Sequence, residues 1–150
     1  MATLNVTITE EMTLNGKDQG NTNTLSISSV TAVINRIMTI DNTEEDILNF
    51  QAAREAAGAI EDGTLQYLRL THIGSANTIL LRIQSTVDTK EYIVQLAAGE
   101  SFMLFNDNAM DVNTGGDIDS TASLSQLDTI KALCSSGDNG AELELFAVAT

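Results

Sequence analysis

Short runs of alternating apolar and polar residues, separated by turn-forming residues, extend along most of the chain. Between residues 64 and 105 this alternation predicts four successive strands. Side chains alternate between the two faces of a strand, so the apolar set of each strand should point into a core. In the second and third of these strands the expected core residues are Ile79, Leu81, Ile83, Tyr92, Val94 and Leu96.

The alternation continues on both sides of this central stretch. Residues 3–14 predict a half-buried strand, and residues 24–40 predict two strands with a bend between them. Two closing strands are expected at residues 128–135 and 141–150. Residues 43–60 are ambiguous: a strand followed by a helical turn or loop is favoured, but the segment QAAREAAGA within it has high helix propensity.

Turn residues divide these strands. Asn15-Gly16 marks a polar loop, and Gly74–Asn77 joins the first two central strands at a length typical of a hairpin. Residues 106–126 form a polar stretch that is long for a loop in a compact domain, and such loops are usually functional, disordered or held by a neighbour.

The pattern predicts an all-β protein of about eight to ten short strands with at most one short helix. We expect an antiparallel two-sheet β-sandwich, with one face of each sheet in the core. A length of 150 residues is typical of a single domain. Residues 1–22 are either the first strand of this domain or an extended N-terminal arm.

The charge balance narrows the range of partners. A net charge of −14, with only 7 scattered basic residues, argues against binding to nucleic acid or to anionic membranes. The acids keep an apolar, strand-rich protein in solution, or they meet a basic partner or divalent cations. No signal peptide is recognisable at the N-terminus, and no apolar run approaches the ~20 residues that span a bilayer. We therefore expect synthesis in the cytoplasm.

Few residues are suited to catalysis, and no cofactor is expected. The single histidine, His72, should be a half-exposed strand-end residue, and the single cysteine, Cys134, a small buried apolar one. One histidine and one cysteine far apart in sequence do not make a usual zinc site. The oxygen-rich loop contains weak calcium candidates, although their spacing does not match an EF-hand. These candidates are Asp107, Asp111, Asp117 and Asp119.

Several apolar residues fall on predicted outward faces, namely Leu80, Ile93, Phe146 and Val148. Gathered on one surface, such residues mark a subunit interface. The chain also contains no proline, a residue that commonly prevents exposed edge strands from pairing with another chain. We therefore expect a homo-oligomer whose strand edges are covered by neighbouring copies.

Parts of the chain resemble small β-sandwich structural proteins of tailed bacteriophages, notably podoviruses of marine cyanobacteria. The resembling segments are residues 67–73, 79–83, 96–104, 127–132 and 141–146, which together make up part of both the centre and the end of the chain. His72 and the Ala-rich segment 51–59 depart from the pattern, and the resemblance brings no catalytic residues with it.

The resemblance implies a jelly-roll-like fold and a non-enzymatic role as a capsid cement or decoration protein. Such a protein acts as a homotrimer on the capsid surface of the virion, with the major capsid protein as its partner. The alternative is a carbohydrate- or host-binding module of a tail fibre or surface appendage. A carboxylate-dependent hydrolase is the enzymatic alternative, and it is the least favoured of the three.

Overall fold

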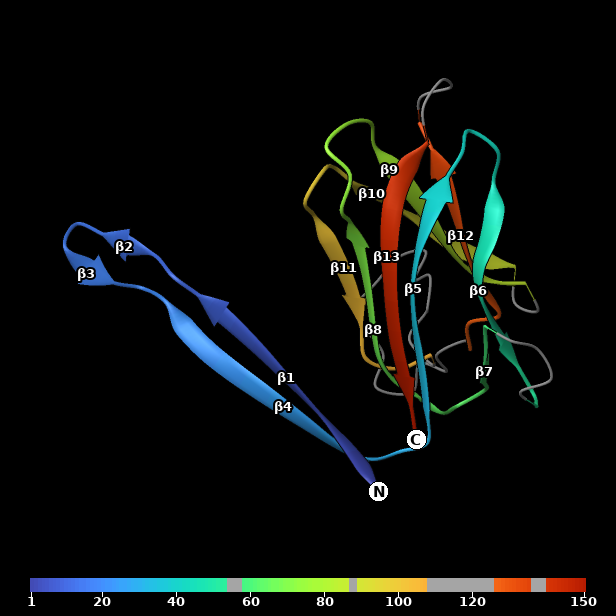
Figure 1. Ribbon diagram of the computed structural model, residues 1–150, viewed down its shortest axis with the longest axis horizontal. Coiled ribbons are helices and arrows are strands. Elements are labelled where there is room, and N and C mark those ends of the chain that lie inside the picture. Colours follow the sequence, from blue (N-terminus) through green and yellow to red (C-terminus); the bar gives the residue numbers. More distant parts are fainter. Residues whose placement is uncertain (54–57, 87–88, 108–125, 136–139) are drawn as a thin grey trace, which may run out of the picture.

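The computed structural model describes residues 1–53, 58–86, 89–107, 126–135 and 140–150. Within these residues every regular element is a β-strand, and no helix is present. The strands form two layers that pack face to face, together with a long hairpin that projects away from them (Figure 1). The chain is thus an all-β sandwich, as its alternating pattern predicts.

Four strands form the first sheet, in the order β11-β8-β13-β5. Five strands form the second, in the order β10-β9-β12-β6-β7. All neighbours are antiparallel except β6 and β7, which are parallel over three residues. The bounds of the first sheet are β5 Ala32–Ile40, β8 Leu65–His72, β11 Ser101–Leu104 and β13 Ala141–Ala149. Those of the second are β6 Glu45–Gln51, β7 Ala59–Glu61, β9 Ile79–Ser85, β10 Lys90–Leu96 and β12 Thr129–Cys134.

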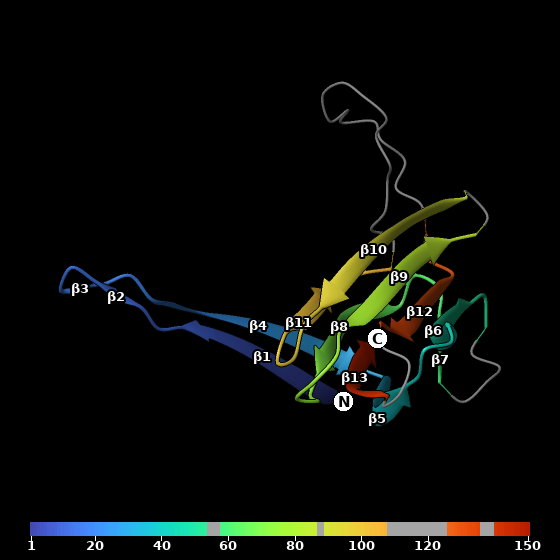
Figure 2. The ribbon, with the colours of Figure 1, turned by 90° about the horizontal axis from the view of Figure 1, so that it is seen from above.

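The strands pair in a nested order. The innermost pair is β9–β10, followed by β8–β11, β6–β12 and finally β5–β13. Successive pairs lie in opposite sheets, and the contacts β9–β12 and β8–β13 join the pairs within each sheet. The domain therefore corresponds to one long antiparallel hairpin rolled into two layers, which the second view shows from above (Figure 2).

The core lies between the two sheets. From the four-stranded sheet it receives Leu68, Leu70, Leu143 and Leu145, and from the five-stranded sheet Ile79, Leu81, Ile83 and Ile130, all fully buried. Tyr92 and Val94 are partly buried against this core, and Leu96 is buried within it. The inward residues predicted from the alternation of β9 and β10 are therefore confirmed.

Two local predictions are wrong. Gly74–Asn77 does not close a hairpin, because β8 and β9 lie in different sheets and the connection crosses between them. His72 is fully buried instead of half-exposed, because it continues the inward parity of Leu68 and Leu70 along β8. The ambiguous segment contains strands β6 and β7, with residues 54–57 outside the described part.

The projecting hairpin, which we call the arm, comprises residues 1–30. Its long strands are β1 Ala2–Glu10 and β4 Asn21–Val30, and its tip carries the short pair β2 Thr13–Leu14 and β3 Lys17–Asp18. Asn15 and Gly16, at the tip, both have positive φ, as a two-residue hairpin turn requires. The expected arm thus extends beyond residue 22, because the chain returns along β4 before it enters the sandwich.

Candidate functional site: the arm and the sheet face beneath it

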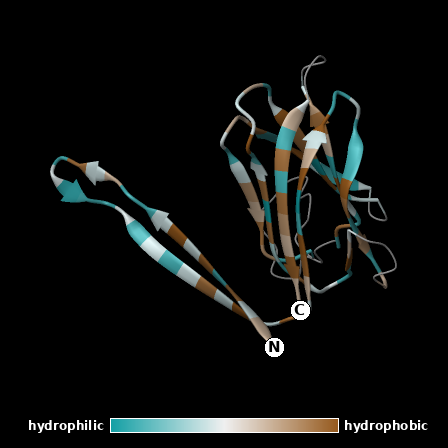
Figure 3. Ribbon diagram, in the orientation of Figure 1, coloured by the Kyte–Doolittle hydropathy of each residue, from teal (hydrophilic) through white to brown (hydrophobic). Residues whose placement is uncertain are grey.

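The arm has one apolar and one polar face. Cross-strand register sets Leu4 opposite Ile27 and Val6 opposite Leu25, which puts their apolar side chains on one face. The other face carries hydroxyl groups, with Thr7 opposite Thr24 and their oxygens 3.2 Å apart. Figure 3 shows apolar and polar residues alternating along both long strands. The arm is therefore an amphipathic two-stranded ribbon.

The base of this ribbon is docked on the sandwich. Ile27 packs with Tyr67 and Val148, which point outward from β8 and β13 of the four-stranded sheet. All three are buried, and Leu4 and Val6 from β1 pack against them in part. The apolar face of the arm thus begins as a small second core on the outer surface of that sheet.

The same apolar face continues past the docked base without a covering layer in the described part of the chain. Leu25 is 41% exposed and Ile8 is 37% exposed. At the tip, Met12 and Leu14 are exposed by more than half. An isolated two-stranded hairpin is at best marginally stable in water, so an arm of this length needs a second surface to hold it.

The shaft of the arm, residues 2–9 and 19–30, contains none of the 21 acidic or 7 basic side chains. The charged residues of the arm lie at its tip, from Glu10 to Asp18. In a chain with a net charge of −14 this is an unusual distribution. A charge-free shaft allows another acidic molecule to approach it without electrostatic repulsion.

A bulge lies where the arm leaves the sandwich. The register between β1 and β4 shifts by one residue between the pairs Ala2↔Val30 and Leu4↔Ile27. Ser29, inside this shift, has a φ of 60°, which non-glycine residues adopt rarely. Just beyond the arm, the Thr31 amide donates to the Ala149 carbonyl at 3.0 Å. The bulge therefore bends β4 next to an anchored residue.

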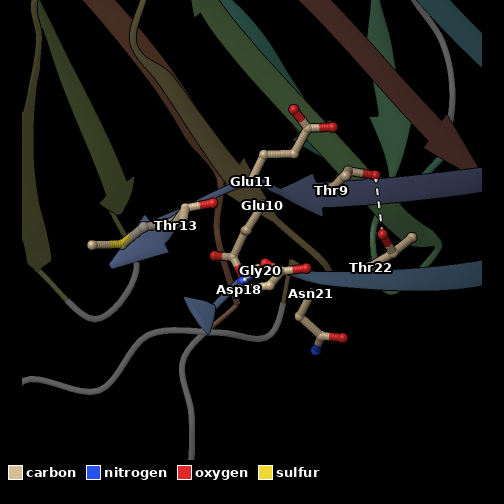
Figure 4. Close-up of a pocket in the computed structure, with 9 residues that line it drawn as sticks. Thr9, Glu10, Glu11, Thr13, Asp18, Gly20, Asn21 and Thr22 are labelled. Carbon is tan, nitrogen blue, oxygen red and sulfur yellow. Dashed lines mark hydrogen bonds between the residues drawn. The ribbon is translucent and has the colours of Figure 1, made fainter. Parts of the chain in front are cut away.

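The tip of the arm holds an open hollow lined by hydroxyl, amide and carboxylate groups (Figure 4). At its edge the Gly20 amide donates to Asp18 Oδ1 at 2.8 Å. A Cβ at Gly20 would lie 2.2 Å from the Glu10 carbonyl oxygen, so only glycine fits this crossing. The hollow lies beside this close approach of the two strands, and its groups can form hydrogen bonds with a polar partner.

The four apolar residues predicted at an interface do not form one surface. Leu80 and Ile93 lie on the outer face of the five-stranded sheet, where Ile93 is 58% exposed. Phe146 and Val148 lie on the outer face of the four-stranded sheet, beneath the base of the arm. Val148 is fully buried there. The structure thus separates the predicted set into two pairs and covers one of them with the chain itself.

The outer face of the five-stranded sheet also carries ion pairs. Arg82 lies 3.1 Å from Glu44, and Lys131 contacts both Glu44 and Asp46 at 3.6 and 3.4 Å. All four side chains are about one-third to one-half exposed, and ion pairs of this kind contribute little to stability. The outer face of the four-stranded sheet also carries an ion pair, Arg69 with Glu144 at 2.8 Å, next to the apolar patch beneath the arm.

The residues considered for catalysis or metal binding lie apart from the arm. His72 is fully buried, and within the described residues neither of its ring nitrogens has a hydrogen-bond partner. Cys134 is buried, as predicted. Asp111, Asp117 and Asp119 lie outside the described residues. Among the described residues, no three His, Cys, Asp or Glu side chains group in a way that could hold a metal ion.

The fourth calcium candidate, Asp107, is buried and holds a turn. Its Oδ2 accepts the Gly63 amide at 2.7 Å, and its carbonyl accepts the Leu127 amide at 2.8 Å. The turn includes Asp62, whose pKa is raised by desolvation first and then by the negative charges of Asp107, Asp128 and Glu61. Asp107 thus ties together three segments distant in sequence.

Comparison of the chain with protein-family models, curated proteins and solved structures finds no match. No helix in the described ranges is long and apolar enough to cross a membrane. The fold alone therefore tells which class of protein this is. It is a two-sheet β-sandwich with a docked, amphipathic hairpin arm.

The sequence predicts an N-terminal arm at residues 1–22 as one alternative and expects it to contribute to a contact surface, but it does not predict that the arm returns along β4. Leu25 and Ile27 fall within a predicted strand region and were expected to belong to the sandwich. The absence of charge from residues 19–30 is a feature of this strand, but it continues to Asn35 in β5 and so does not mark where the arm ends. The candidate site is consequently the arm together with the sheet face beneath it.

Proposed function

We propose that the protein is a non-enzymatic structural subunit that works through contacts between copies, as a capsid cement or decoration protein of a bacteriophage virion. The observation that carries this proposal is the arm. Its apolar face is docked at the base and uncovered further out in the described part of the chain. A ribbon of this kind joins subunits, and it has no evident use in a solitary globular domain.

The nested pairing of the sandwich supports the capsid assignment. We propose that the two sheets, β11-β8-β13-β5 and β10-β9-β12-β6, have the double-sheet arrangement of a jelly roll. Jelly rolls recur in viral capsid domains and in lectins. A fold alone does not identify a function, so the phage assignment also depends on the resemblance of residues 67–73 and 96–104 to phage structural proteins.

In this role the chain acts by adding contact area. Copies associate with one another, as a homotrimer, and the assembled subunit binds the major capsid protein across the junctions of the outer shell. Each additional interface must be broken before the shell can open, so the bound subunits resist outward pressure from packaged DNA. No chemical step is required, and the acidic surface keeps the free subunit soluble before assembly.

The test is the protein content of purified virions from the phage whose genome encodes this chain. We expect the chain in those virions at a copy number close to that of the capsomers, and we expect purified protein to co-sediment with capsids that lack it. A chain that is absent from virions, or that fails to co-sediment with such capsids, overturns the capsid role.

The polar hollow at the arm tip favours one second candidate. Hydroxyl, amide and carboxylate groups such as those of Thr9, Asn21 and Asp18 can form hydrogen bonds with sugar hydroxyls. A carbohydrate- or host-binding module of a tail fibre would use such a hollow. Binding of the isolated protein to a glycan array at micromolar affinity would support this role in place of the capsid role.

A further inference from the structure

We infer that the distal half of the arm, residues 8–25, docks on a second copy of this chain, where it covers the outward side chains of Val33 and Ile37 on β5. This inference deepens the proposed function by naming the surfaces through which copies associate. It depends on self-association and is independent of the capsid partner.

The arm supplies one half of the contact. Leu4, Val6 and Ile27 use the apolar face of the arm to dock on the chain's own sandwich. Ile8 and Leu25 extend that same face and are exposed, at 37% and 41%. The apolar face of the arm is therefore buried along half its length, and its exposed half can make a second contact of the same kind.

Strand β5 supplies the other half. Val33 and Ile37 point outward from the four-stranded sheet and are 51% and 64% exposed. Val33 lies directly opposite Val148, which the chain's own arm buries. The exposed strip on β5 is thus continuous with the surface on which the arm base already docks. A neighbour's arm could lie beside that base and extend the same apolar cluster.

The distribution of charge favours a second copy as the occupant. Two copies of a chain with a net charge of −14 repel each other unless their contact surfaces lack acids. The shaft of the arm and Val33 meet this condition, because residues 2–9 and 19–35 contain no charged side chain. Ile37 lies opposite Glu144, whose charge is paired with that of Arg69 at 2.8 Å. The charge-free stretch includes both strands of the shaft and continues into Val33 on β5. An acidic partner of identical sequence can therefore meet the chain along these residues.

The position of β5 in the sheet supports the same conclusion. It is an edge strand of nine residues, and one side of it pairs with β13. The basic residue of this strand, Arg36, donates to the Ile47 carbonyl of the other sheet and so does not shield the outward face. A docked arm would cover this outward face.

Arm and sheet are different surfaces, so the contact is heterologous. Heterologous contacts either close into rings or continue as open filaments. In a ring each copy docks its arm on one neighbour and is contacted by the arm of another, so the arm and the β5 strip are covered in every copy. This arrangement is compatible with the homotrimer expected from the sequence, and it links the subunits in one direction around the ring.

Disulfide cross-linking between two variants that each carry one introduced cysteine tests the contact. Ile8→Cys, carrying a size tag, is mixed with untagged Ile37→Cys under mild oxidation. Cys134 is 1% exposed and does not compete in the folded chain. Two matched controls change one partner at a time: Thr7→Cys moves the thiol to the polar face of the arm, and Ile93→Cys moves it to the outer face of the other sheet.

We expect the tagged and untagged chains to form a mixed disulfide at least about tenfold faster than either control pair, which corresponds to about 1.4 kcal/mol in the activation barrier. Cross-linking that is equal in all pairs, or absent from the test pair, overturns the docking. Virions without the protein would refute the capsid role and leave this result intact. A failed cross-link in an oligomer still bound to capsids would refute the arm contact alone.

Discussion

Ile27 in the arm packs against Val148 in the last strand of the chain, and both side chains are buried, at 7% and 0% exposed. This contact joins the N-terminal hairpin to the outer face of the four-stranded sheet. It also explains why Val148, on an outward position of β13, is not available to a partner. The arm and the sandwich are therefore one folded unit at the base of the arm.

Removing the larger side chain of this contact should loosen the arm. For Ile27→Ala we expect the free energy of unfolding to fall by about 2 kcal/mol, the lower end for such truncations, because the cluster lies outside the main core. Urea denaturation followed by circular dichroism measures this change. Ser26→Ala, on the polar face next to it, is the matched control and should change stability by less than about 0.5 kcal/mol. Equal losses in both variants would contradict the docking.

His72 is buried with two unpartnered ring nitrogens among the described residues, and such atoms carry a desolvation cost. We expect His72→Leu to raise the free energy of unfolding by about 1 kcal/mol, since it replaces the ring with an apolar side chain in the same layer as Leu70. His72→Ala, which leaves a cavity, should instead lower it. A lower urea midpoint for His72→Leu, with an unchanged slope, would indicate that the ring has a partner after all.

Asp107 is buried and its carboxylate accepts a hydrogen bond from the Gly63 amide. Removal of this carboxylate therefore leaves a backbone donor without its partner. We expect Asp107→Ala to cost about 1–3 kcal/mol, and Asp107→Asn, which keeps an acceptor oxygen, to cost less. Thermal melting in EDTA and in millimolar Ca²⁺ should give the same midpoint for the wild-type chain. A calcium-dependent rise that disappears in Asp107→Asn would show that this carboxylate binds metal.

Stability near Asp62 should depend on pH. The pKa of this carboxyl is raised in the folded state, so its ionised form is less favourable there than in the unfolded chain. The resulting destabilisation is present at neutral pH and is lost as the pH falls below the ordinary pKa of 3.8. We therefore expect Asp62→Asn to be more stable than wild type at pH 7, with a smaller difference near pH 4. Urea titrations at both pH values check this, with Glu11→Gln at the arm tip as the control.

The sandwich could be predicted from the sequence because burial on one face imposes a period of two. Ile79, Leu81 and Ile83 are assigned correctly on that basis, and so is the buried Cys134. The prediction for His72 is wrong because a position at a strand end suggests partial exposure, whereas β8 continues the inward parity of Leu68 as far as this residue. Alternation decides the face of a strand, and a single polar residue does not change it.

Pairing between distant strands could not be predicted. Gly74–Asn77 is short enough for a hairpin, and nothing local distinguishes that arrangement from a crossing between sheets. The return strand of the arm, beyond residue 22, could not be predicted for a related reason, since Leu25 and Ile27 alternate as core residues do. Their partners, Tyr67 and Val148, are far away in sequence and come together with them only in the folded chain.

The mass of the protein in solution shows directly whether copies associate through the arm. Sedimentation equilibrium of the full chain at micromolar concentration should give a multiple of 16.0 kDa, threefold for the expected homotrimer. Ile8→Glu should shift this mass to that of one chain, whereas Thr7→Glu, on the polar face, should leave it unchanged. A wild-type mass of 16.0 kDa throughout that concentration range would show that copies do not associate.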